Sequence, residues 1–475
     1  MNTDIVEVKS SGAAYLKEKL IPVSITKLLP ILFLFIITIL FAQKLSKYDY
    51  GQFQTIYFFG NILSVVLNFG ISSLILSSNL ETIVSFIKKN KLKVLGSYLL
   101  LGLVVFFIVY NIPNLSKDTL FLLYLYIALQ VFNSVIDSIL IKTNRIKIFV
   151  WLNFIYSLFF LAIQLYFYFF TFNLNLLLLY IIILSALKFI SYFFCKIKFA
   201  YSQNKIEEKL VIKNWVFIGI TTTIGIVAMW LDKLYMQYIM TPEQFAVFFN
   251  GAIELPFLGI IIGAMETILL KNISSNLNNK QEAASLFKES IKILSNIAIP
   301  LFFCFLIIHQ EAFSIILKDK YNESIPVFFI YIFLIPLRVT HFGVILQCYG
   351  KAYIVTLGAF LDIVLSFTLM VLLYPKFGSK GVALALVVST YLQVVFYLWK
   401  SADVLKINIA KLIPTKYLFQ ILVANAILFG ALYFTKNYCT SMVFFIATLL
   451  ITTVVIVILF YSYWKKSNNY NSKLL

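Results

Sequence analysis

The sequence predicts an all-α polytopic membrane protein, and three observations carry this prediction. The 475 residues are 61% hydrophobic and only 12% charged, with a mean hydropathy of +0.93, which lies outside the range of soluble globular domains. Apolar stretches long enough to cross a bilayer, about 20 residues each, recur along the chain. Lysines collect in alternate polar breaks. We therefore expect about 14 transmembrane helices, arranged as two six-helix lobes related as parallel repeats, plus two C-terminal helices.

The apolar stretches follow one another between short polar breaks. In chain order we expect spans at residues 20–42, 52–79, 94–113, 119–141, 148–171, 174–195, 214–231, 245–269, 292–317, 325–347, 353–374, 381–399, 417–435 and 441–463. The seventh is the shortest, and we expect Asp232 and Lys233 to lie in water at its outer end. The first has no small-residue cleavage site at its end, so we expect it to remain a membrane span.

Positive residues favour cytoplasmic loops, which gives an independent test of the span order. With a cytoplasmic N-terminus, 27 of the 39 Lys and Arg residues face the cytoplasm, nine face outward and three lie within spans. We therefore predict a multi-pass protein with both termini cytoplasmic. The net charge of +19 mostly reflects this bias, since the lysines are dispersed over short loops. We expect anionic membrane lipid as their partner and no nucleic acid.

The polar link "CKIKFAYSQNKIEEKLVIKN" divides the chain between the sixth and seventh spans. We expect an N-terminal lobe at 1–200, a cytoplasmic link at 201–213, a C-terminal lobe at 214–400, and the last two spans with a cytoplasmic tail at 401–475. Six spans per lobe is an even number, so both lobes enter the membrane in the same sense, which predicts parallel repeats. Gln52-Phe53 and Gln244-Phe245 each start a span after a short outward loop. Chance in an apolar chain explains this recurrence equally well.

The short loops argue against most enzyme classes. The longest outward loop, about residues 318–324, has no room for a catalytic domain, and the chain lacks the GxxxxGK[ST] phosphate-binding loop. His309 and His341 are too few for a His-rich metal site, and the four cysteines have no paired or metal-ligand spacing. We therefore expect no metal, no cofactor and no enzymatic activity, and transport becomes the favoured function.

Three ionisable residues lie near the middle of their spans, too deep to reach an interface: Glu254, Arg338 and Asp362. A charge at this depth costs about 3 kcal/mol or more on insertion scales, so it usually faces a cavity or a partner. We take Arg338 as a candidate substrate-binding residue, and Glu254 and Asp362 as candidate ion-coupling residues. The alternative is that Arg338 pairs with Glu254 or Asp362 and has only a structural role.

Four further polar residues within spans are candidate cavity residues. Lys27 either lines a cavity or extends to the cytoplasmic interface. His341 follows Arg338 by three residues and so shares its helix face, where it either extends a donor patch or packs. Asn61 and Asn68 are seven residues apart and share a face, which suits a hydrophilic lumen or an interhelical hydrogen bond.

Two charges near helix ends have simpler expected roles. Asp137 lies close to Lys142 and Arg145 in the sequence, so we expect it to pair with one of them. Lys188 lies deeper in the sixth span, and we expect its long side chain to extend to the interface.

Four stretches resemble a known family. "LSKYDYGQFQTIYFFGNILSVVLNFGISSLI" (45–75) looks like the second-helix signature of the Wzx-type polysaccharide flippases. "LYPKFGSKGVALALVVSTYLQVVFYLW" is similar to their eleven-to-twelve junction, "IDSILIKTNRIKIFVWLNFIYSL" to their four-to-five loop, and "WLDKLYMQYIMTPEQFAVFFNGAIEL" to their seven-to-eight segment. Asp362 stands where that family usually has Asn. The similar lipid II flippases and multidrug and toxin extrusion exporters share the architecture, and all belong to the multidrug/oligosaccharidyl-lipid/polysaccharide exporter superfamily.

The resemblance implies a flippase of the bacterial cell inner membrane. Such a protein moves undecaprenyl-diphosphate-linked oligosaccharide repeat units from the cytoplasmic to the outer leaflet by ion-coupled alternating access, for O-antigen, lipopolysaccharide or other surface polysaccharide biosynthesis. Its implied partners are the lipid-linked oligosaccharide, a polysaccharide polymerase and a chain-length regulator. Two alternatives stay open: a multidrug or metabolite exporter of the same fold, and a membrane glycan polymerase, which is an enzyme.

Overall fold

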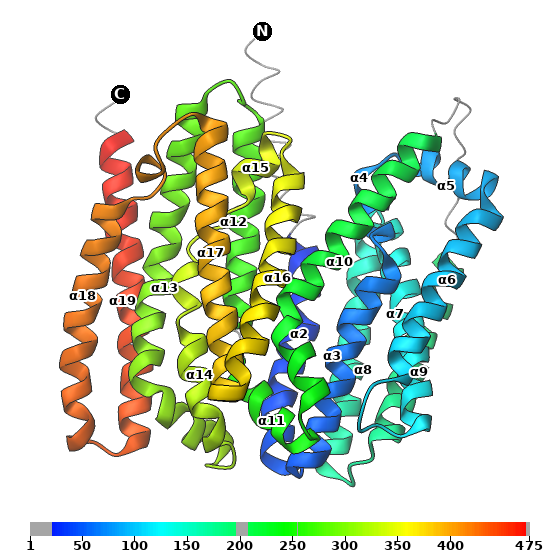
Figure 1. Cartoon of the computed structure of the whole chain (residues 1–475), viewed down its shortest axis with the longest axis horizontal. Helices are drawn as coiled ribbons and strands as arrows, with labels where there is room; N and C mark the ends of the chain where they lie inside the picture. Colours follow the sequence, from blue (N-terminus) through cyan, green and yellow to red (C-terminus); the bar gives the residue numbers. More distant parts are fainter. Residues whose placement is uncertain (1–20, 196–207, 254, 472–475) are drawn as a thin grey trace. The chain divides into compact units, whose positions relative to one another are not determined.

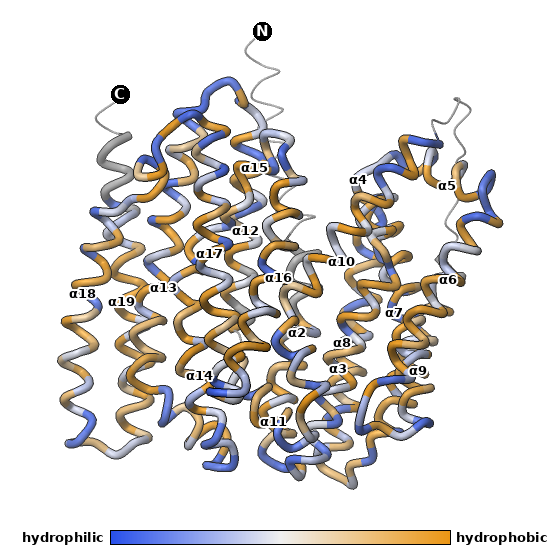
Figure 2. The backbone as a smooth tube through the Cα atoms, in the orientation of Figure 1, coloured by the Kyte–Doolittle hydropathy of each residue, from blue (hydrophilic) through white to orange (hydrophobic). Residues whose placement is uncertain are grey.

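The computed structural model describes residues 21–195, 208–253 and 255–471 (Figure 1). Within these ranges it does not describe the side chains of residues 21–28, 31, 193, 195, 256, 257, 260, 464 and 466–471. These residues form α-helices and short 3-10 turns, and no strand occurs among them. The predicted all-α class is therefore confirmed. Figure 2 shows apolar residues along the middle of the long helices and hydrophilic residues toward their ends, as a bilayer requires.

Within the described ranges, ten helices are long and apolar enough to cross a membrane. They are α6 (Lys91–Tyr110), α7 (Lys117–Lys142), α8 (Ile146–Phe169), α9 (Leu174–Ser191), α10 (Glu208–Ile239), α13 (Lys280–Leu317), α16 (Ala352–Phe377), α17 (Ser379–Leu405), α18 (Thr415–Thr435) and α19 (Ser441–Asn471). An eleventh span consists of α3 (Lys47–Asn68) and α4 (Ile71–Ser77), which are bent by 54° at the break between them.

The remaining three predicted spans correspond to a helix that is only partly described and to two interrupted ones. The first is α2 (Ile21–Lys44). The eighth consists of α11 (Pro242–Gly251) and α12 (Pro256–Ser274), and the tenth consists of α14 (Ile325–Ile332), the 3-10 turn η4 (Ile335–Leu337) and α15 (Val344–Cys348). Each interruption lies beside a proline, Pro256 or Pro336, because proline disfavours a helical residue before it and donates no backbone hydrogen bond. The described helices are thus consistent with fourteen spans.

The seventh span does not end at Leu231. Helix α10 continues to Ile239, and Asp232 and Lys233 are buried, with 0% and 4% of their surface exposed. The Lys233 ammonium lies 3.1 Å from the Asp232 carboxylate, which also accepts a hydrogen bond from the Tyr331 hydroxyl of α14. The expectation that both residues are in water was wrong, because they neutralise each other inside the protein.

The chain forms two compact units. The first comprises the described residues up to Trp230 together with Gln237–Ala246, and the second comprises Leu231–Met236 together with the described residues from Val247 onward. Trp215, which lies in the predicted C-terminal lobe, packs in the first unit against Ile71 and Leu74 of α4. The division into two repeat-related lobes stays a prediction. Its bounds are 1–200 and 214–400 for the lobes, 201–213 for the link and 401–475 for the last part.

The start of α3, in the first unit, carries several polar residues between positions 46 and 52. Ser46 caps the helix: its hydroxyl oxygen accepts from the Asp49 amide at 3.0 Å, and the hydroxyl lies 2.6 Å from the Asp49 carboxylate. Tyr50 is fully buried, and Gln52 donates to the backbone oxygen of Asn114 at 2.8 Å. These residues anchor the start of α3.

Gly51 allows α3 to approach α11 within the first unit. A Cβ added at Gly51 would lie 2.0 Å from the carbonyl oxygen of Pro242. We expect Gly51→Ala to destabilise the folded protein by about 1–3 kcal/mol or more, since the clash is with backbone. Thermal unfolding in detergent measures this, with Gly96→Ala as control, because nothing lies within 4 Å of its added Cβ. Equal melting temperatures for the two variants would contradict the close packing.

Candidate substrate-binding site

A broken helix forms one wall of a polar pocket in the first unit. Helix α3 ends at Asn68, and the next two residues, Phe69 and Gly70, have left-handed backbones with φ of 42° and 72°. Phe69 is strained there, because a side chain disfavours this region. Neighbouring helices hold the break: Trp215 of α10 donates to the backbone oxygen of Phe69, and Tyr98 of α6 donates to that of Asn68, both at 3.1 Å. The carbonyls freed at the break are thus paired, as membrane depth requires.

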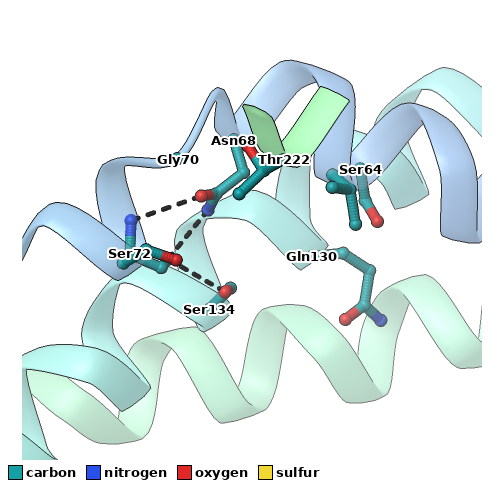
Figure 3. Close-up of a pocket in the computed structure, with 9 residues that line it drawn as sticks. Ser64, Asn68, Gly70, Ser72, Gln130, Ser134 and Thr222 are labelled. Carbon is teal, nitrogen blue, oxygen red and sulfur yellow. Dashed lines mark hydrogen bonds between the residues drawn. The ribbon is translucent and has the colours of Figure 1, made fainter. Parts of the chain in front are cut away.

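The pocket has a volume of about 220 Å³ and takes its lining from α3, α4, α7 and α10 (Figure 3). The lining residues are Ser64, Val65, Asn68, Gly70, Ser72, Ser73, Gln130, Ser134 and Thr222. Seven of the nine carry a hydroxyl or an amide, and none carries a charge. The pocket is therefore a neutral hydrogen-bonding site within a membrane-spanning bundle.

Asn68 connects the break to α7. Its amide nitrogen donates to the Ser72 hydroxyl at 2.9 Å, and its amide oxygen accepts from the Ser72 backbone at 3.3 Å. The Ser72 and Ser134 hydroxyls are 3.0 Å apart, so the chain of bonds reaches α7 (Figure 3). Asn68 therefore both lines a cavity and takes part in interhelical bonding. Asn61, on the same helix face, lies exposed outside this lining.

An ion pair with little solvent exposure lies on the same side of α7, with 8% of the Lys188 side chain and 20% of the Asp137 side chain exposed. The Lys188 ammonium of α9 lies 3.0 Å from the Asp137 carboxylate and donates to the Asn153 side chain of α8 at 2.9 Å. Asn153 in turn donates to Asp137 at 3.1 Å, and the Tyr192 hydroxyl donates to the same carboxylate. Three helices and the turn after α9 thus share one charge-paired cluster.

This cluster corrects two expectations. Asp137 pairs with Lys188 across 51 residues rather than with Lys142 or Arg145, and Lys142 instead donates to the backbone oxygen of Leu76 at 2.9 Å. Lys188 does not extend to an interface, because only 8% of its side chain is exposed. Packing of α7 against α9 brings the Asp137 carboxylate and the Lys188 ammonium together.

Tyr156 of α8 joins the ion pair to the pocket. Its hydroxyl accepts from the Gln130 amide at 3.2 Å and lies 3.1 Å from the Ser185 hydroxyl. The Lys188 ammonium lies over the Tyr156 ring, 5.1 Å from its centroid. One side chain therefore contacts both a pocket residue and the buried cation.

In the second unit, Arg338 and His341 do not share a helix face, contrary to expectation. Arg338 directly follows the 3-10 turn η4 and is half-buried, and His341 lies in the non-helical segment before α15. The His341 Nδ1 is 3.2 Å from a carboxylate oxygen of Glu266 on α12. Sequence reasoning missed Glu266, although an acidic residue within the apolar run "GAMETILL" was a usable signal.

Asp362 lies on the face of α16 that packs against α17. The buried residues of α16 are Gly358, Asp362, Ser366 and Met370, which recur every fourth position. Asp362 is 8% exposed, and within the described part of the chain it forms no ion pair and its Oδ1 has no hydrogen-bond partner. The alternative that Asp362 pairs with Arg338 is therefore not observed. Of the other candidates, Glu254 and the Lys27 side chain lie outside the described residues.

No protein-family model matches this sequence, and no curated protein matches it. Several solved structures resemble the fold. A lipid II flippase MurJ in an inward closed conformation aligns with a TM-score of 0.70 at 17% identity, covering 93% of this chain and 98% of its own. A MATE-family multidrug resistance transporter in an inward-facing conformation gives 0.57 at 15% identity, covering 82% and 98%. A transporter of the MOP superfamily from Pyrococcus furiosus gives 0.57 at 13% identity, covering 82% and 95%.

These likenesses show the fold. The chain shares its fold with a lipid II flippase and with two transporters.

Proposed function

We propose that this protein is a flippase that moves undecaprenyl-diphosphate-linked oligosaccharide repeat units from the cytoplasmic to the outer leaflet of a bacterial inner membrane. The observation that carries the proposal is the uncharged, hydroxyl-lined and amide-lined pocket of the first unit, in a chain that has the fold of a lipid II flippase over 93% of its length. The repeat units would serve O-antigen or another surface polysaccharide, and a polymerase with its chain-length regulator would take them up outside.

The pocket suits the head group of such a lipid. A sugar hydroxyl that leaves water without a new partner costs roughly 1–3 kcal/mol on the evidence of protein mutations, so a transported glycan needs donors and acceptors at membrane depth. Hydroxyls and amides supply both. With the N-terminus cytoplasmic, the end of α3 lies on the cytoplasmic side, where the substrate is loaded.

The charged candidates have separate proposed roles in this mechanism. Arg338 would bind the diphosphate, because a guanidinium forms charge-assisted bonds that offset the loss of hydration. Lys27 would assist from the first span, and Asn61 and His341 would provide further polar contacts. Asp362 and Glu254 are proposed ion-coupling residues, since a carboxyl at membrane depth can take up a cation or a proton during alternating access.

Export of a drug or metabolite is the second candidate, because MATE transporters share the fold at a TM-score of 0.57. It is less well supported, since that likeness covers 82% of the chain instead of 93%. It predicts altered drug sensitivity without a glycan defect.

Deletion of the gene in its native host tests the proposed function. We expect complete oligosaccharide on its diphosphate carrier to accumulate on the cytoplasmic side, and wild-type protein to restore delivery. Normal delivery in a strain without a second flippase would exclude the proposal. Unpolymerised single repeats accumulating outside would instead indicate a polymerase.

A further inference from the structure

We propose that the pocket at the broken helix of the first unit binds one uncharged sugar ring of the repeat unit and discriminates against acidic sugars. The inference rests on the proposed function and adds a substrate class to it. The structure supports it through the volume of the pocket, the direction of its hydrogen-bonding groups and the state of the charges beside it.

The volume of the pocket sets the size of its ligand. Pockets for drug-sized molecules typically measure about 300–1,000 Å³, whereas this one measures about 220 Å³. A water molecule takes up about 30 Å³ in the liquid, so the pocket is several times larger than one buried water requires. A pocket of about 220 Å³ has the size of a single pyranose ring, whereas an oligosaccharide is larger than the pocket.

The hydrogen-bonding groups of the wall are already oriented. Ser64 donates to the backbone oxygen of Asn61 at 2.9 Å, and Thr222 donates to that of Ile218 at 2.9 Å. Each hydroxyl thus already donates its hydrogen to the backbone, and its oxygen can accept a hydrogen bond from a ligand. Gln130 donates one amide hydrogen to Tyr156, and its side chain also bonds to Tyr126, so its carbonyl oxygen is the group that can accept from a ligand. Sugar hydroxyls, which can donate, match these acceptors.

The charges near the pocket leave an acidic sugar without a partner. No lining residue is cationic, and Lys188, which reaches Tyr156 behind Gln130, is neutralised by Asp137 and bonded to Asn153. A carboxylate entering this partly open pocket would lose part of its hydration and gain no cation, which is unfavourable. A neutral ring has no charge, so this free-energy cost of losing hydration does not arise. The pocket therefore selects for uncharged rings.

The test uses purified protein in nanodiscs and two probes, a polyprenyl diphosphate carrying one glucose and the same lipid carrying one glucuronate. We expect the wild type to bind the glucose lipid at least about tenfold more tightly. Thr222→Val, which removes one acceptor, should weaken glucose-lipid binding by about two- to tenfold, the range for one hydrogen bond. Its matched control is Thr453→Val, whose hydroxyl bonds to its own helix in the same way at 2.9 Å on exposed α19.

A charge placed in the pocket gives a second, independent readout. Gln130→Lys should shift the preference toward the glucuronate lipid by about tenfold, because it supplies the missing cation. Equal binding of both lipids by the wild type, or an unchanged preference in a folded Gln130→Lys protein, would overturn the pocket assignment and leave the flippase proposal intact. Failure of the folded wild type to bind either lipid would refute the flippase proposal itself.

Discussion

Asp137→Ala will destabilise the protein by about 3–5 kcal/mol, the usual effect of removing one partner of a buried ion pair. The Lys188 ammonium would remain inside the helix bundle, where 8% of its side chain is exposed, and among the described residues it would keep the Asn153 side chain and the Tyr156 ring as partners but no anion. An uncompensated charge there is far more costly than a lost surface contact. Denaturant titration of the purified protein in mild detergent measures the effect.

Two controls distinguish the effect of leaving a charge buried from the effect of removing any charged residue. Lys89→Ala breaks the 2.7 Å pair with Glu208, whose lysine side chain is 68% exposed, and should cost no more than about 1 kcal/mol. The double variant Asp137→Leu with Lys188→Met removes both charges and should recover most of the stability, since apolar replacement of a buried pair is often neutral. Equal destabilisation by Asp137→Ala and Lys89→Ala would show that the pair is not buried in the membrane protein.

Arg338→Ala will weaken binding and flipping of the diphosphate-linked substrate by about 10- to 150-fold, which corresponds to the roughly 1.5–3 kcal/mol of a hydrogen bond to a charged group. Arg338 is half-buried and directly follows a 3-10 turn, outside regular helix. Arg338→Lys keeps the charge but loses the bidentate geometry, and we expect an intermediate effect. Flipping rates at matched protein levels in liposomes measure both variants.

The same experiment distinguishes a substrate role from a structural one. If Arg338 only stabilised the fold, Arg338→Ala would lower the melting temperature and leave the substrate affinity of the surviving protein unchanged. Full flipping by Arg338→Ala at normal protein levels would remove Arg338 from the proposed binding residues.

Most helices could be predicted from the sequence, because their signal is local. A run of about 20 apolar residues predicts a membrane span whatever its neighbours do, and all fourteen predicted stretches overlap described helices. The breaks were harder. Phe69 and Gly70 adopt a left-handed backbone because Trp215 and Tyr98, which lie on other helices, donate hydrogen bonds to the freed carbonyls. The residues next to Phe69 in the sequence do not indicate these distant partners.

The candidate site could be predicted only in part. Asn68 was noticed because an amide is rare in an apolar run, but Ser72, Ser134 and Thr222 were not, since hydroxyls are common in spans and often bond to their own helix. The pairing of Asp137 with Lys188 depends on how α7 packs against α9. The expected partner of Asp137, Lys142 or Arg145, was therefore wrong, because proximity in the sequence does not show how helices pack. Asp232 and Lys233 were misjudged in the same way, because α14 covers them.

The central claim is that this fold carries a lipid-linked glycan across the membrane, and reconstitution tests it most directly. Purified protein would be placed in liposomes that carry, in one leaflet, a polyprenyl diphosphate bearing a short uncharged oligosaccharide, and lectin accessibility of the glycan would be followed over time. We predict rapid transfer with the wild type and slow transfer with Arg338→Ala. Transfer no faster than in protein-free liposomes, by folded wild-type protein tested with a proton and then a sodium gradient, would contradict the account.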